Sequence, residues 1–87
     1  MKKLWDDNAW EEYLYWQTKD KKTLKKINQL LKDIDRNGYN CTGKPEPLKG
    51  SLAGYWSVRI DDKNRIVFRI ENDNLEIMQC GSHYRDK

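Results

Sequence analysis

The fold is decided by residues 55–70, which read YWSVRIDDKNRIVFRI. Apolar and polar side chains alternate on both sides of the polar turn 61–64, as they do in strands with one buried face. A further apolar run, 75–80, follows the turn 71–74. The last third of the chain therefore predicts a three-stranded antiparallel meander, whose first two strands share an apolar face formed by Trp56, Val58, Ile60, Ile66, Phe68 and Ile70.

The register of the first two strands sets which residues share a face, because side chains alternate strictly. If both apolar sets face the same way, Arg59 lies near Arg65 on the other face and the turn has an odd number of residues, most simply 60–64. The alternative register would place Arg59 beside Phe68 and leave both faces mixed. We therefore predict one apolar face, covered by helices, and one cationic face. The facing of the third strand stays open, because both of its sides carry apolar pairs: Leu75 with Ile77, and Met78 with Cys80.

The first half of the chain predicts two helices. Residues 1–5 could form a short first strand. Residues 8–18 show the spacing of a one-faced helix, with N-cap oxygens offered by residues 6–8 and a capping box expected between Asn8 and Glu11. A second helix is predicted from the joint at residues 19–20 to the glycine stop at residue 38, and its apolar face consists of Leu24, Ile27, Leu30, Leu31 and Ile34.

Together these elements predict one α+β domain spanning residues 1–87. Its N-terminal antiparallel helical hairpin would pack on a mainly antiparallel β-sheet. Between helices and meander, residues 38–54 hold four of the five glycines and both prolines. This segment is interpreted as a long ordered loop, and long loops in compact domains are often functional.

Composition limits the classes of function. The net charge is +3, from 17 Lys and Arg against 14 Asp and Glu, which is weak for a dedicated nucleic-acid binder unless the charges cluster. Cys41 and Cys80 are far apart and lack metal-ligand spacing, so we expect free thiols in a reducing cytoplasm. No apolar run approaches the ~18 residues of a membrane span. With one histidine and no phosphate-binding glycine motif, neither a metal nor a cofactor is predicted.

Several charged side chains could surround a phosphodiester. Arg59 and Arg65, with Lys49 in the preceding loop, would make an anion site, although a solvated sheet face is the simpler interpretation of the arginines alone. Glu46 stands between two prolines that stiffen its backbone, and His83 can exchange a proton near neutral pH. Such a set suffices for metal-free RNA cleavage, in which a base takes the 2′-hydroxyl proton, the oxygen attacks phosphorus, and an acid protonates the leaving 5′-oxygen.

Four stretches carry a resemblance to a known family. They are WEEYLYW at 10–16, GKPEPLK at 43–49, GYWS at 54–57, and the closing His83-Tyr84. Together they resemble the YoeB family of toxin ribonucleases over nearly the whole chain. The resemblance implies a RelE-like fold and metal-independent cleavage of messenger RNA in the ribosomal A site. It also implies a YefM-type antitoxin that holds the toxin inactive, repression of the operon through operator DNA, and frequent homodimers.

The resemblance also implies roles for single residues. Glu46 would be the general base and His83 the general acid, although the two could exchange roles. Arg65 would steady the scissile phosphate and the charge that builds on it. Lys49 and Arg59 would assist electrostatically.

The resemblance also implies a role for Tyr84, which would pack against or orient a base. The sequence departs from the family pattern at three places. Gly81-Ser82 replaces a more basic or aromatic pair before the histidine, and residues 85–87 extend past the tyrosine where many relatives end. Val58 stands where the family often has another arginine, so the site is expected to be less cationic than usual.

The lysines on the second helix could touch ribosomal RNA phosphates, although a solvated helix face explains them about equally well; they are Lys21, Lys22, Lys25 and Lys26. The alternative functions are a gyrase poison of the ParE type and a non-catalytic nucleic-acid-binding partner of an antitoxin. Glu46 and His83 favour the ribonuclease, because neither alternative needs an acid–base pair.

Overall fold

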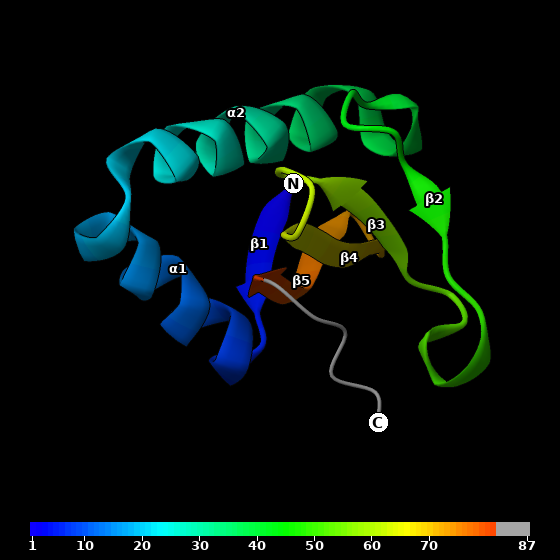
Figure 1. Cartoon of the computed structure of the whole chain (residues 1–87). Helices are drawn as coiled ribbons and strands as arrows, with labels where there is room; N and C mark the ends of the chain where they lie inside the picture. The colour runs from blue at the N-terminus through cyan, green and yellow to red at the C-terminus, as the bar shows by residue number, and fades with distance from the viewer. Residues whose placement is uncertain (82–87) are drawn as a thin grey trace.

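Five strands form one sheet in the computed structural model, which describes residues 1–81. Their order across the sheet is β1-β5-β4-β3-β2; β1 is parallel to β5, and the other pairs are antiparallel. The strands are β1 (Lys2–Trp5), β2 (Glu46–Pro47), β3 (Trp56–Arg59), β4 (Arg65–Glu71) and β5 (Asn74–Gly81). Figure 1 shows that β1 and β2 lie on opposite sides of the central three strands.

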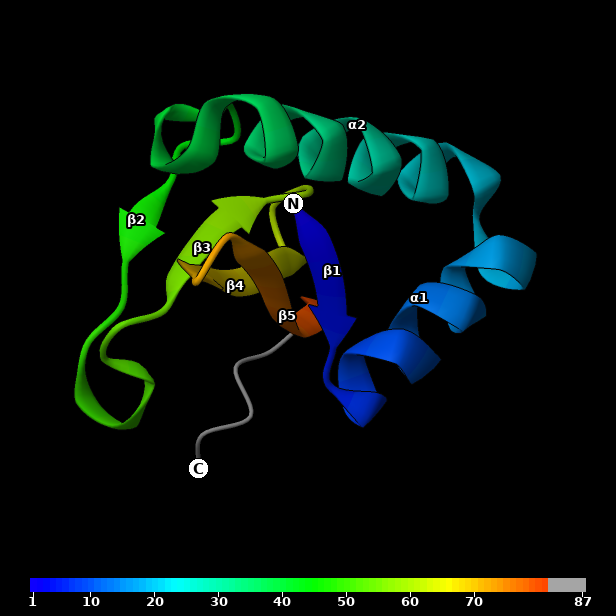
Figure 2. The same ribbon diagram turned by 180° about the vertical axis from the view of Figure 1, so that it is seen from behind.

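Two helices separate β1 from the rest of the sheet in sequence. α1 (Asp7–Lys19) follows β1 directly, and α2 (Lys21–Asn37) follows α1 after the single residue Asp20. The Asp20 carboxylate caps α2 by accepting hydrogen bonds from the backbone of Lys22 and Thr23. Away from this joint the helices diverge rather than lie side by side along their length (Figures 1 and 2). The predicted helices and their order are confirmed.

The start of α1 differs from the capping box expected from sequence. The N-cap is Asp6, whose carboxylate accepts from the backbone of Asn8, so the helix begins at Asp7. The reason is the end of β1: the Asp6 N–H is bound to the Ile77 carbonyl at 2.9 Å. This bond keeps Asp6 extended at the sheet edge, where its side chain is the first that can reach back to the free N–H groups of the helix.

The predicted register between β3 and β4 is confirmed. Arg59 is paired with Arg65, and the Ile60 N–H is bound to the Asn64 carbonyl at 2.9 Å, which closes the five-residue turn 60–64. Apolar residues of both strands consequently face the helices together.

A β-bulge settles the facing of β5. Val67 is paired with Gln79 and Phe68 with Ile77, so Met78 is an extra residue between the two pairs. The extra residue shifts the alternation by one position. Leu75, Ile77 and Cys80 can therefore all belong to the buried core, each at most 1 % exposed.

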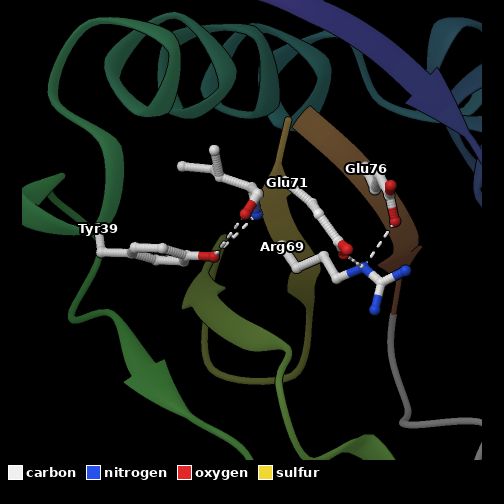
Figure 3. A network of polar contacts seen from close by, with 5 residues as sticks. Tyr39, Arg69, Glu71 and Glu76 are labelled. Atoms are coloured by element: carbon white, nitrogen blue, oxygen red, sulfur yellow. Dashed lines mark hydrogen bonds and ion pairs between the residues drawn. The ribbon is translucent and has the colours of Figure 1, made fainter. Parts of the chain in front are cut away.

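The segment 38–54 is more regular than the single loop expected from sequence. It contains two short 3₁₀ turns, η1 (Gly38–Asn40) and η2 (Gly50–Leu52), and the two-residue strand β2. Tyr39 ties η1 to the sheet, because its hydroxyl accepts a 2.8 Å hydrogen bond from the backbone of Ile70 (Figure 3). Gly43 crosses the core edge so closely that a Cβ there would lie 3.0 Å from Leu30 and 3.1 Å from Val58. These contacts order the segment without long regular elements.

The core lies between α2 and the helix-facing side of the sheet. From α2 it takes Ile27, Leu30, Leu31 and Ile34, which are the apolar positions predicted from the helical spacing apart from Leu24.

Ile34 has no exposed surface, so its replacement by alanine leaves a cavity. We expect Ile34→Ala to lower the free energy of unfolding by about 2–5 kcal/mol, measured by urea denaturation. Lys32→Ala, on the exposed side of the same helix, is the control and should change it by less than about 0.5 kcal/mol. Equal losses would contradict this placement of the core.

Candidate active site

One carboxylate of the 38–54 segment lies on the sheet face that points away from the helices. Glu46 in β2 is paired with Ser57 in β3, and Ser57 is paired with Val67 in β4. Directly opposed residues share a face, and Val67 alternates with the core residues Ile66 and Phe68. The exposed Glu46 side chain therefore stands on the opposite face. We call this face the polar face; its residues include Glu46, Ser57, Arg59, Arg65 and Gln79.

The two predicted arginines stand directly opposite each other on the polar face. Arg65 is held toward the turn, because its Nη1 donates to the carbonyls of Asp61 at 2.7 Å and Asn64 at 3.1 Å. This orientation leaves Nε and Nη2 as the side of the guanidinium fork that can meet phosphate oxygens. Glu46 and Arg59 are diagonal neighbours on adjacent strands, a position in which two Cα atoms lie about 7–8 Å apart. Strand spacing puts the Cα atoms of Glu46 and Arg65 about 12 Å apart.

The turn that supports Arg65 is itself held by Asp61. Burial raises the pKa of the Asp61 carboxyl, but hydrogen bonds from the Asn64 side chain and from the backbone of Lys63 and Asn64 outweigh it, so the pKa lies below its ordinary value of 3.8. A carboxyl with a lowered folded pKa stabilises the fold above its unfolded pKa and loses that contribution as the pH falls through the folded pKa. The support under Arg65 is therefore present at neutral pH.

A third arginine on the polar face is already paired with carboxylates. The Nε of Arg69 lies 2.6 Å from Glu76 Oε1 and 3.2 Å from Glu71 Oε1 (Figure 3). Its guanidinium carbon also lies 4.9 Å from the centre of the Tyr55 ring. With two carboxylates beside it, Arg69 adds little net positive charge for an incoming phosphate.

The prediction that the whole face is cationic was therefore wrong, because positive charge covers only one end of it. The middle of the polar face is formed by Ser57, Val67 and Gln79, which are at most 2 % exposed. Positive charge without a carboxylate partner, among the described residues of this face, is concentrated at one end, on Arg59 and Arg65. The reason is that the arginine at the other end, Arg69, lies beside the acidic residues Glu71 of β4 and Glu76 of β5.

The other predicted site residues lie farther out or beyond the described chain. Lys49 is exposed and directly precedes η2. His83 and Tyr84 lie outside the described residues. The helix lysines Lys21, Lys22, Lys25 and Lys26 are all exposed. Within residues 1–81, the register thus brings Glu46, Arg59 and Arg65 to one face.

A pocket of about 420 Å³ opens beside the end of β5, and sequence reasoning missed it. Helix α1 forms one wall and the turn before β4 contributes another part. No sequence signal marked it, because its lining residues come from α1, the turn before β4 and the end of β5, which lie far apart in the chain. Its lining consists of Asn8, Glu11, Glu12, Tyr15, Trp16, Asn64, Cys80 and Gly81.

The described residues contain neither a metal-binding cluster nor a membrane-spanning helix. Within residues 1–81, no three His, Cys, Asp or Glu side chains are grouped so that they could hold a metal ion. Neither of the two α-helices is long and apolar enough to span a bilayer.

Sequence comparison finds close relatives over the full length. Residues 5–84 match the family described as "YoeB-like toxin of bacterial type II toxin-antitoxin system". Toxin YoeB of Escherichia coli strain K12 is 48 % identical over 84 residues, covering 97 % of this chain and all of the relative.

Structural comparison finds the same fold in solved toxins. The YoeB/ParE toxin from Agrobacterium tumefaciens superposes with a TM-score of 0.92 at 43 % identity, covering 97 % of this chain and 100 % of that one. The YoeB-YefM complex from Staphylococcus aureus contains a chain with a TM-score of 0.89 at 44 % identity, with 97 % and 98 % coverage. The YoeB dimer from the same organism gives 0.88 at 45 % identity, with the same coverage.

Proposed function

The chain belongs to the YoeB-like toxins of bacterial type II toxin–antitoxin systems, and we propose that it is a ribosome-dependent endoribonuclease. Its substrate is messenger RNA in the ribosomal A site, and its chemistry uses no metal or cofactor. The observation that carries the proposal is the shared position of Glu46, Arg59 and Arg65 on the polar face. A carboxylate and two guanidiniums are the groups that proton abstraction next to a phosphodiester requires.

In the proposed reaction, the Glu46 carboxylate takes the proton of the 2′-hydroxyl at the cut. The 2′-oxygen attacks the adjacent phosphorus, and the bond to the 5′-oxygen of the next nucleotide breaks. His83 as imidazolium gives its proton to that leaving oxygen, which yields a 2′,3′-cyclic phosphate and a 5′-hydroxyl. Because either group can give or take a proton, the two roles could be exchanged.

The remaining side chains act through charge and position. Negative charge develops on the non-bridging oxygens of the phosphate during the attack, and Arg65 offers Nε and Nη2 to it. Arg59, opposite Arg65, and Lys49 add positive charge nearby. Tyr84, next to His83 in the sequence, packs against or orients a base.

The proposed partners follow from the relatives. A Staphylococcus aureus relative was solved with YefM and also as a dimer. We propose a YefM-type antitoxin and a homodimer for this chain, with operator DNA bound through the antitoxin complex. The toxin would act in the cytoplasm on translating ribosomes, where the exposed lysines of α2 contact ribosomal RNA phosphates.

Primer extension on a defined message tests this function. The purified chain should produce cuts only when the message is translated, at positions that follow the reading frame. A message without a ribosome-binding site is the control and should stay whole. Cuts that ignore translation, or none on ribosomes, would contradict the proposal. Stabilised gyrase–DNA cleavage complexes in a parallel assay would instead identify a toxin of the ParE type.

A further inference from the structure

At its C-terminal end, strand β5 is bordered on its outer side by helix α1 and, within residues 1–81, not by a neighbouring strand. β1 pairs with β5 only as far as Trp5 opposite Ile77, after which the chain turns into α1. Beyond this point the outer edge of β5 has no neighbouring strand among the described residues. Backbone groups on such an edge need other partners when they are buried.

Two side chains of α1 supply these partners at Cys80. Glu12 Oε1 accepts a 2.8 Å hydrogen bond from the Cys80 N–H, and Trp16 Nε1 donates a 2.9 Å hydrogen bond to the Cys80 carbonyl. Glu12 and Trp16 are four residues apart and therefore lie on the same face of the helix. Both backbone polar groups of Cys80 are thus bound by α1, and we call these two contacts the α1 clamp.

Gly81 lies against Glu12 of the α1 clamp, which leaves little room for a side chain at this position. Its φ is not in the left-handed region, so its backbone conformation does not require glycine. A Cβ at this position would lie 2.5 Å from Glu12 Oε2 and 2.9 Å from Glu12 Cδ. A side chain at residue 81 therefore requires the end of the Glu12 side chain to shift, and this shift displaces the carboxylate that is bound to Cys80.

We infer that Glu12 and Trp16 are positioning residues, which fix the end of β5 from which the segment carrying His83 begins, and that Gly81 is required by their packing. The inference rests on the proposed function, because it assigns the α1 clamp to the placement of the proposed proton donor. His83 follows Gly81 by two residues, so a displaced strand end displaces the start of the short connection to it. A misplacement of about 1 Å can cost about 100-fold in rate.

A double-mutant cycle on Glu12 and Gly81 tests the inference. Gly81→Ala and Glu12→Ala should each lower the single-turnover cleavage rate roughly 10- to 100-fold, with the half-saturating ribosome concentration nearly unchanged. The double variant should be no slower than Glu12→Ala, because the methyl group then has nothing to displace. Glu12→Gln keeps an oxygen acceptor and should be faster than Glu12→Ala. Glu11→Ala removes a carboxylate one position away and should cleave like the parent.

Alkylation of Cys80 reports on the clamp without any activity. Burial, helped by the Glu12 carboxylate, raises the pKa of the Cys80 thiol to about 12, so the parent should react very slowly with iodoacetamide at pH 8. Glu12→Ala removes a charge-assisted hydrogen bond, and Cys80 labelling followed by mass spectrometry should become roughly 10- to 100-fold faster. Glu11→Ala should label like the parent.

The two readouts separate failure of the inference from failure of the proposed function. If the parent cuts no translated message, the function is wrong, while the labelling still tests the clamp. Unchanged labelling in Glu12→Ala would overturn the clamp itself. Parent-like cleavage by Gly81→Ala, effects of the two substitutions that multiply, or an equal loss in Glu11→Ala would overturn the positioning role.

Discussion

Arg65→Ala is expected to lower the single-turnover rate of messenger cleavage roughly 10²- to 10³-fold, the loss typical when a preorganised donor to developing negative charge is removed. The physical reason is the orientation of this guanidinium. Two carbonyls of the turn 60–64 hold its Nη1, so the rest of the fork is set before the substrate arrives. Lysine at this position keeps the charge but not the fork geometry, so Arg65→Lys should recover only part of the rate.

Arg36→Ala is the matched control for this result. Arg36 is an exposed arginine in the last turn of α2, and its removal changes the net charge by the same amount. Its cleavage rate should stay near that of the parent at the same salt concentration. If Arg65→Ala cuts as fast as Arg36→Ala, the polar face is not where the phosphate is bound.

The second large effect is expected at the two proposed proton-transfer residues. Glu46→Gln and His83→Gln should each reduce the cleavage rate roughly 10²- to 10⁴-fold, the usual contribution of a positioned acid or base. Both substitutions preserve approximate size and remove the ability to exchange a proton at neutral pH. The measurement is the single-turnover rate on programmed ribosomes across a range of pH.

The pH–rate profiles also assign the two roles. The variant that lacks the general base should lose the acid-side fall in rate, and the variant that lacks the general acid should lose the alkaline-side fall. Glu12→Gln on α1 is a less suitable control here because it touches β5, so Glu11→Gln is used. Parent-like rates for both Glu46→Gln and His83→Gln would remove them from the chemistry.

The pairing of β3 with β4 was predictable because the alternation of apolar and polar side chains within each strand agrees with the register between them. Both strands alternate over four or more residues, and of the two registers weighed only the one that pairs Arg59 with Arg65 places Val58 and Ile66 on the same side. The same reasoning could not settle β5, since its answer depends on a bulge at Met78 that no pattern in the sequence marks. An extra residue is visible only once the partner strand is in place.

The candidate site was predictable in part, for a related reason. Arg59 and Arg65 follow from the hairpin register, which is set by residues close in sequence. The strand position of Glu46 was missed, because two residues flanked by loop carry no alternation to detect. The contacts of Glu12 and Trp16 with Cys80 span 68 and 64 positions. Such contacts are products of the tertiary fold rather than of local sequence.

The proposed mechanism requires the 2′-hydroxyl of the message as the attacking group, and a message that lacks this hydroxyl at one position tests the requirement. Ribosomes are programmed with a message that carries a single 2′-deoxynucleotide on the 5′ side of the mapped cut, next to an all-ribose message of the same sequence. We predict that the all-ribose message is cut to a 2′,3′-cyclic phosphate and a 5′-hydroxyl, and that the deoxy message is not cut at that bond. Equal cutting of both messages, or products that end in a 3′-hydroxyl and a 5′-phosphate, would contradict the proposed mechanism.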